Sequence, residues 1–206
     1  TLSLLRKHVN VSEVTLQDGA IFLYTDTTGY SNSYVLQGKS ETKKKSSSTK
    51  DANVKQFTLR NISFIIDNRQ KFKLFHLDIR KLDGKLHASD SSIQFTMLSD
   101  IYSKSFAFNT NKGSYLKDKK LELNLSVIYN KRTKILNIPQ QEIKIDDHPV
   151  LIAGQFGFGE KPSPFTLKRN ANQVLLHDAA SWLSPNISTK LNNITLTKPL
   201  DAEADL

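Results

Sequence analysis

Apolar and polar residues alternate along most of this chain, and the longest such region covers residues 119–158. Apolar side chains recur at every second position over 121–129, at 143 and 145, and again over 150–158. A period of two places successive side chains on opposite faces of a strand. We therefore predict an antiparallel meander with one apolar face and one polar face in this region.

The first part of the chain continues this pattern and contains a weak internal repeat. Residues 57–64 repeat the pattern of residues 14–21 after 43 positions, and such repeated units build elongated β architectures. Asp18-Gly19 predicts a bulge or bend within the first strand. Tyr34 and Leu36 predict a return strand, and Asp83-Gly84 predicts a hairpin after a strand over residues 72–82.

Helical patterning is confined to residues near 174–192. Residues 174–183 predict a helix capped by Asp178, and Pro185 suits the first turn of a second short helix ending at Leu191. A final strand follows from Thr197, and we expect its partner beyond the end of the chain. The fold class is mainly β: a long curved antiparallel sheet of ten or more strands, forming a groove or partly open barrel with one short helical segment.

Composition excludes several classes of site and sets the domain organisation. The chain has 206 residues and no cysteine, which excludes disulfides and thiol nucleophiles. No run approaches the roughly 20 apolar residues of a membrane-spanning helix. Residues 1–206 are expected to form a single elongated β domain. Because the chain lacks an initial Met and ends at Ala-Asp-Leu, we expect it to be a portion of a longer protein.

One segment supplies +4 of the net charge of +9, and the remaining +5 is spread along the predicted strands. Residues 39–50 carry five Lys and one Glu among serines and threonines. Such a composition buries little, and it predicts a mobile, solvated loop. The alternative is a module that binds a polyanion or glycan through these lysines. Binding to nucleic acid is not expected.

No group of residues has the spacing of a catalytic or metal site. The five histidines lack metal-ligand spacing, and His76 and His87 are expected to form a surface pair across the predicted hairpin. The Asp146-Asp147-His148-Pro149 sequence is typical of a polar β-corner. The glycines of residues 154–159 suit a strand rather than a dinucleotide loop. We therefore expect neither an enzyme nor a cofactor.

The functional signal is instead a long half-apolar sheet with little to cover it. The helical region can cover only part of the apolar face. The rest of that face must curl on itself, pack on another sheet, or hold an apolar ligand. A closed sandwich or barrel with a dry core, serving a structural or interaction role, remains open as the alternative. The residues predicted to line a lipid groove are Leu121, Leu123, Leu125, Ile143, Ile145, Ile152, Phe156 and Phe158.

Several phrases resemble the AsmA family of Gram-negative envelope proteins, especially its Bacteroidetes-type members. They are VTLQDGAIFLYTD (14–26), FTLRNISFIIDNR (57–69), KLELNLSVIYN (120–130), GQFGF (154–158), ASWLSPNISTKL (180–191) and KPLDAEA (198–204). The LSPNI segment before a Lys-Pro strand is the most distinctive. The likeness spans nearly all of the chain, with the segment 39–50 as a departure from it.

This resemblance implies a periplasmic segment of a protein anchored in the inner membrane by a part outside this chain. It implies a body related to the repeating β-groove of bridge-like lipid transfer proteins. The implied role is to move or organise phospholipid, or another acyl-chain lipid, between the inner and outer membranes during outer-membrane assembly. Other envelope proteins are implied as partners.

Overall fold

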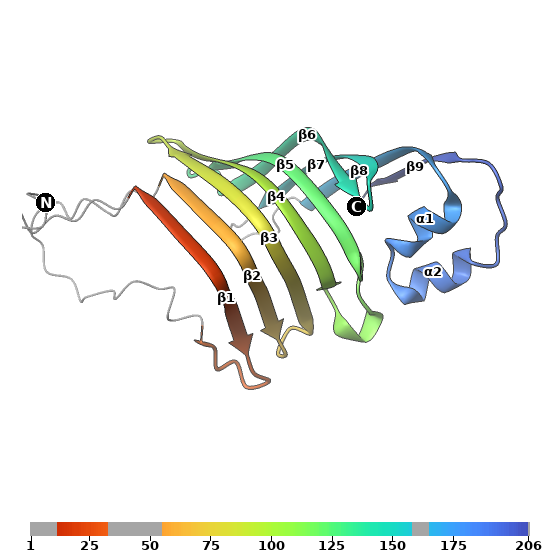
Figure 1. Ribbon diagram of the computed structural model, residues 1–206, viewed down its shortest axis with the longest axis horizontal. Helices are drawn as coiled ribbons and strands as arrows, with labels where there is room; N and C mark the ends of the chain where they lie inside the picture. Colours follow the sequence, from red (N-terminus) through yellow and green to blue (C-terminus); the bar gives the residue numbers. More distant parts are fainter. Residues whose placement is uncertain (1–11, 33–54, 158–164, 206) are drawn as a thin grey trace, which may run out of the picture.

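The computed structural model describes residues 12–32, 55–157 and 165–205, which form one nine-stranded sheet and two short helices (Figure 1). The mainly β prediction is confirmed. The strands are β1 (Glu13–Thr25), β2 (Gln56–Asn68), β3 (Lys73–Ala88), β4 (Ser92–Ala107), β5 (Lys119–Asn130), β6 (Ile135–Ile145), β7 (His148–Gly157), β8 (Phe165–Val174) and β9 (Leu200–Asp205). The helices are α1 (Leu176–Ser181) and α2 (Pro185–Leu191), with a 3-10 turn, η3, at Thr110–Lys112.

The strands lie side by side in chain order, and the sheet does not close, because β1 and β9 form its two edges. Seven of the eight strand pairs are antiparallel, but β1 and β2 run parallel. The prediction of a wholly antiparallel sheet is wrong at this pair. The described residues also contain nine strands rather than ten or more.

The parallel pair is built from the internal repeat. Val14 lies opposite Phe57 and Ile21 opposite Phe64, so the register has the same offset as the repeat. Both strands are also distorted at one level, where Asp18 and Asn61 adopt left-handed φ values of 55° and 52°. The Asn61 side-chain amide donates a 2.9 Å hydrogen bond to the Asp18 carboxylate. Parallel pairing thus places the two copies of the repeat and their two left-handed residues side by side. At the predicted bulge or bend of Asp18-Gly19, the backbone is distorted at Asp18 but the register with β2 does not shift.

The predicted hairpin at Asp83-Gly84 is wrong, because both residues lie inside β3. A Cβ on Gly84 would lie 2.5 Å from the ring of Phe57, so this glycine allows an aromatic ring of β2 to cross it rather than making a turn. The chain turns later, where the Ser89 N–H donates to the Ser92 carbonyl (2.8 Å). His76 and His87 therefore lie on one strand and do not face each other across a hairpin.

Strand β6 is bent in the middle (Figure 1). Its register with β5 shifts between Leu123 and Ile128, and its register with β7 shifts between Ile138 and Gln141. Pro139 lies in this interval and has no N–H to give to a ladder. The side chain of Gln141 bonds the backbone of β5 in this interval. Its carbonyl accepts from the Ser126 N–H (2.7 Å), and its amide donates to the Ser126 carbonyl (3.0 Å).

The helical segment has the predicted form with one exception. Pro185 occupies the first turn of α2, which ends at Leu191 as predicted. The N-cap of α1 is Leu175, without a side-chain hydrogen bond, so the prediction that Asp178 caps it is wrong. Asp178 instead lies in the first turn, where a carboxylate also suits the helix dipole. The last strand, β9, pairs with β8 inside the chain, and its other edge carries no strand of the described residues.

Several sequence predictions concern residues outside the described ranges. They are the return strand at Tyr34 and Leu36, the Lys/Ser-rich segment 39–50, and Phe158.

Candidate functional site

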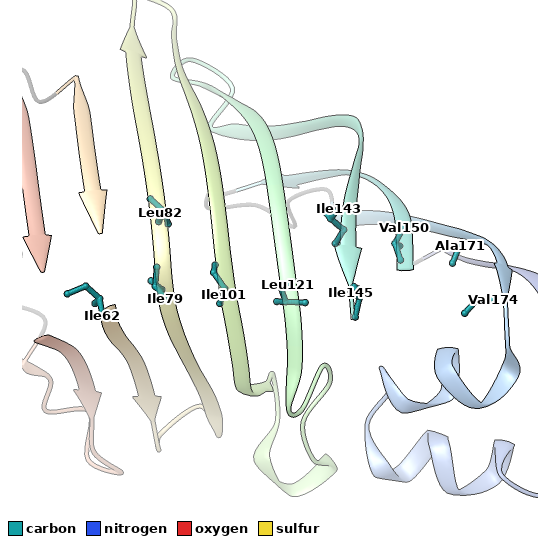
Figure 2. Packing of buried hydrophobic residues seen from close by; sticks show 10 residues of the cluster. All are labelled: Ile62, Ile79, Leu82, Ile101, Leu121, Ile143, Ile145, Val150, Ala171 and Val174. Carbon is teal, nitrogen blue, oxygen red and sulfur yellow. The ribbon is translucent and has the colours of Figure 1, made fainter. Parts of the chain in front are cut away.

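One face of the sheet carries a continuous belt of buried apolar side chains. Ile62, Ile79, Ile101, Leu121 and Ile145 follow one another directly across β2 to β6, and each has 3–7% of its surface exposed. We call the following set the buried belt, shown in Figure 2: Ile62, Ile79, Leu82, Ile101, Leu121, Ile143, Ile145, Val150, Ala171 and Val174.

The opposite face of the same strands leaves its large apolar side chains in solvent. Leu98 is 52% exposed, Tyr102 43% and Ile128 37%. Leu98 and Tyr102 alternate with the buried Ile101 on β4. Since the sheet is curved (Figure 1), this difference in burial indicates that the apolar face lies inside the curve. We call the two sides the apolar face and the polar face.

The helices cover the apolar face at one end, which we call the helix end. Ala179 and Trp182 of the helical segment pack against the buried cluster. The Leu116 N–H donates to the Trp182 carbonyl (2.9 Å), which joins the loop between β4 and β5 to α1. In the same loop a Cβ on Gly113 would lie 2.6 Å from Pro185, so the loop and α2 are in close contact. At this end the helical segment and the β4–β5 loop therefore pack against each other and against part of the buried cluster.

Toward the other end, near the turn that joins β3 to β4, the apolar face is only half-buried. We call this region the far flank. Phe57 and Phe95 stack within it, with ring centroids 5.2 Å apart and an interplanar angle of 9°. No helix of the described residues lies over it (Figure 1). Its half-buried members are Phe57, Phe95, Met97, Leu125, Val127 and Ile152.

Some of the residues predicted to line a groove lie in the buried belt, and the others lie in the half-buried part of the apolar face. Leu121, Ile143 and Ile145 belong to the buried belt. Leu123, Leu125, Ile152 and Phe156 are half-buried, and the first three pack against the belt. Their period of two correctly predicted a shared face. The burial gradient along that face carries no sequence signal, because it depends on where the helices and the β4–β5 loop lie.

Polar groups on the apolar face gather at its centre and at the helix end. Ser99 and Ser103 of β4 are 5% and 0% exposed, and their hydroxyls have no hydrogen-bond partner among the described residues. Lys119 faces Ser103 in the register, and its ammonium lies 2.7 Å from the Asp146 carboxylate. Asp146 and Asp147 adopt left-handed φ values of 48° and 70°, which makes the predicted β-corner a two-residue hairpin turn.

The polar face is a ladder of ion pairs. Lys104 lies 2.6 Å from Asp78, Arg60 2.5 Å from Asp83, and Lys120 2.6 Å from Glu122. The hydrogen bond from Arg60 lowers the pKa of Asp83, and the hydrogen bond from Lys120 lowers that of Glu122. For Asp78, burial works to raise the pKa, but hydrogen bonds from Lys104 and Ser63 outweigh it, and the pKa is lowered. These groups are charged and paired at neutral pH.

This ladder contains a serine, histidine and aspartate that the sequence spacing did not indicate. Ser63 Oγ lies 3.3 Å from His76 Nε2 and 3.1 Å from Asp78 Oδ1. Asp78 approaches the same ring nitrogen, Nε2, at 3.5 Å. In a hydrolytic triad the carboxylate holds the opposite nitrogen and so orients the ring. The arrangement here lacks that geometry, and Asp78 is engaged by Lys104 instead.

Two open hollows also lie on the polar face. One of about 760 Å³ has a mixed lining from neighbouring strands, which includes Asp78 and Lys120 as well as Ile79 of the buried belt. The other, of about 410 Å³, includes Asp100, Glu122 and Lys144. In the described parts of the chain, no cluster of histidines and carboxylates could hold a metal ion. Within those parts, neither helix is long and apolar enough to cross a membrane.

In comparisons with known proteins, no family model, curated protein or solved structure matches this chain.

Proposed function

We propose that this protein binds the acyl chains of phospholipids, or of another acyl-chain lipid, on the far flank of its apolar face. In this proposal the chain is the periplasmic portion of an AsmA-like envelope protein. It shields lipid on its way between the inner and outer membranes and so serves outer-membrane assembly. Its role is physical rather than catalytic.

The observation that carries the proposal is the change in burial along one face. The buried belt is covered by its neighbours and by the helical segment, whereas the far flank is apolar and half-exposed. Monomeric proteins rarely leave large contiguous apolar surfaces open unless something binds there. The polar face also exposes Leu98, Tyr102 and Ile128, but these side chains lie among ion pairs such as Lys120 with Glu122.

The size and chemistry of the far flank suit a hydrocarbon chain. From Phe57 on β2 to Ile152 on β7 the flank crosses six strands. With strands about 4.8 Å apart, this distance is about 24 Å along the sheet. It exceeds one leaflet of a bilayer, about half of a hydrocarbon core of about 30 Å. Each buried CH₂ contributes about 0.8 kcal/mol, so a chain can be held without specific polar contacts.

The test uses neighbouring residues that point to opposite faces. Met97 lies on the far flank and Leu98 on the polar face, and Val127 and Ile128 form a second such pair. A fluorescent fatty acid is titrated into the full chain and into the variants Met97→Ser, Leu98→Ser, Val127→Ser and Ile128→Ser. Circular dichroism establishes that each variant is folded.

The expected result is saturable binding that is weakened about tenfold by Met97→Ser and by Val127→Ser, because each removes one to two CH₂-equivalents of contact. Leu98→Ser and Ile128→Ser should bind like the unchanged protein. Native mass spectrometry of the purified chain should also reveal co-purified lipid. A lipid-free protein that ignores the fatty acid supports the structural role with a closed core, and equal losses in both members of a pair reject the far flank as the site.

A further inference from the structure

Three loops meet at the helix end of strands β1 to β4. They are the turn after β1 (26–31), the β2–β3 turn (69–72) and the β4–β5 loop (108–118). The Thr110 N–H donates to the Phe72 carbonyl (2.7 Å), which joins the second loop to the third. A Cβ on Gly29 would lie 3.0 Å from the Gln70 side chain, so the first loop touches the second. We call these three loops together the tip.

The tip presents aromatic side chains to solvent. Tyr30 is 64% exposed, Phe72 50% and Phe108 51%. Phe108 is held in place, since its ring centroid lies 5.4 Å from that of Phe75 and 5.2 Å from that of Phe106. The Phe108 ring is thus held by its neighbours while about half of its surface remains in water.

Phe72 is one of nine described non-glycine residues with a positive φ, and Leu116 of the β4–β5 loop is the other large apolar one. The φ of Phe72 is 53°, in the left-handed region that a bulky residue occupies only at a cost of about 1–2 kcal/mol. An exposed ring gains little from burial to offset that cost. Strained positions of this kind cluster at sites with a function. Asn or Gly would be the expected residue if the position served only the turn.

The charge of the tip is positive. The loops and the first residue of β3 carry Arg69, Lys71, Lys73, Lys112 and Lys117 against Asp26 and Asp118. The Asp26 carboxylate is occupied by the backbone N–H groups of Thr28 (2.8 Å) and Tyr30 (2.9 Å).

The lysines of the tip differ from those of the polar face in being unpaired. No ion pair joins any of its four lysines to a carboxylate of the described residues, whereas Arg69 pairs with Asp67. The positive charge of the tip is therefore available to a partner.

The described turns at the opposite end of the sheet include a basic one but no exposed aromatic ring. The turn at residues 131–134 is the basic one, with Lys131, Arg132 and Lys134. Neither this turn nor the turn at residues 89–91 carries an exposed large apolar side chain. Among the described turns, only the tip combines exposed rings with unpaired lysines.

We propose that the tip docks on the surface of an anionic phospholipid bilayer, with Tyr30, Phe72 and Phe108 at the headgroup level and the lysines facing lipid phosphates. Aromatic side chains favour this interfacial layer. Basic residues near an anionic leaflet strengthen the attachment. This docking does not depend on whether the far flank holds acyl chains.

The test is co-sedimentation of the full chain with vesicles. One set is pure phosphatidylcholine, and the other is equimolar phosphatidylcholine and phosphatidylglycerol. The tip variants are Phe72→Asn, which suits the left-handed backbone and so keeps the turn, and the double variant Lys71→Gln/Lys112→Gln. The matched controls are Leu98→Ser, which is as exposed as Phe72, and Lys131→Gln/Arg132→Gln at the opposite end.

The unchanged protein should bind the anionic vesicles and not the neutral ones. Phe72→Asn should weaken binding about tenfold, which corresponds to losing one inserted ring. Each lysine should contribute about fivefold. Both control variants should bind as the unchanged protein does. Absence of binding to anionic vesicles, equal binding to neutral ones, or equal losses in the controls overturns the proposal.

Discussion

The buried belt and the far flank occupy the same face of the same strands and are built from the same kinds of residue. Leu121 and Leu125 are two pleats apart on β5, yet Leu121 is 7% exposed and Leu125 only half-buried. The difference comes from what lies over them. Near the helix end, α1 and the β4–β5 loop add cover that the far flank lacks. An alternating pattern therefore defines a face, and the remainder of the fold decides which part of that face is core.

The largest expected difference between the two regions is in stability. Ile101→Ala removes a side chain that is 4% exposed and leaves a cavity, which should lower the free energy of unfolding by about 2–5 kcal/mol. Leu125→Ala should cost only about 1–2 kcal/mol, since part of that surface is already in water. Urea denaturation measures both. Equal costs would mean that the far flank is packed like the belt.

A second comparison tests how tightly the flank is packed around Phe57. Gly84→Ala places a Cβ 2.5 Å from the Phe57 ring and should destabilise the protein by about 1–3 kcal/mol. Gly19→Ala is the control, because its Cβ would meet only Ile62, at 3.8 Å. Thermal unfolding of the two variants gives the comparison. The double variant Gly84→Ala/Phe57→Leu should recover part of the loss, and no recovery would show that another contact is responsible.

The bend of β6 separates the helix-end half of that strand from the half along the flank, and Gln141 holds it. Gln141→Ala removes two hydrogen bonds to the Ser126 backbone and should cost about 1–2 kcal/mol. Amide hydrogen exchange should also rise at Ser126. Gln140→Ala, at an exposed neighbouring position, should change neither quantity. The account of the bend fails if both substitutions behave alike.

The smallest effect belongs to the polar face. Lys120 lowers the pKa of Glu122, so the folded state favours the charged carboxylate. The stabilisation is present above the pKa of the unfolded state, about 4.3, and is lost as pH falls through the lower pKa of the folded state. Stability should therefore decline on acidification below about pH 5. Glu122→Gln should flatten that decline slightly, measured by urea denaturation at several pH values.

The control for acidification is Glu142→Gln on the neighbouring strand. Glu142 is exposed and forms no ion pair among the described residues. A decline that flattens equally in both variants would show that net charge, rather than the pair with Lys120, sets the pH dependence.

The alternating pattern predicted the sheet and the shared face of Leu121 to Ile152, because the pleat alone determines them. The two short helices followed from Pro185 and the apolar spacing before it. The repeat at residues 14 and 57 was visible, but not its parallel pairing, since strand direction depends on the path of the connection. The hairpin prediction at Asp83-Gly84 failed because, in sequence, a glycine needed for close approach to Phe57 cannot be distinguished from a turn glycine.

The candidate site was predictable in kind but not in extent. Period-two spacing placed Ile143 and Leu125 on one face with equal weight. Only the tertiary position of Trp182 and Leu116 distinguishes a covered residue from an open one. The Ser63, His76 and Asp78 cluster was likewise invisible, because it depends on the cross-strand register of β2 and β3.

The most direct test of acyl-chain binding is photolabelling of the full chain with a diazirine-bearing fatty acid, followed by mapping of the labelled residues by mass spectrometry. The account predicts labels on Phe57, Met97 and Leu125 of the far flank, lost on competition with unlabelled fatty acid. Labels on the exposed Leu98 and Ile128 of the polar face, or labels that resist competition, would contradict it.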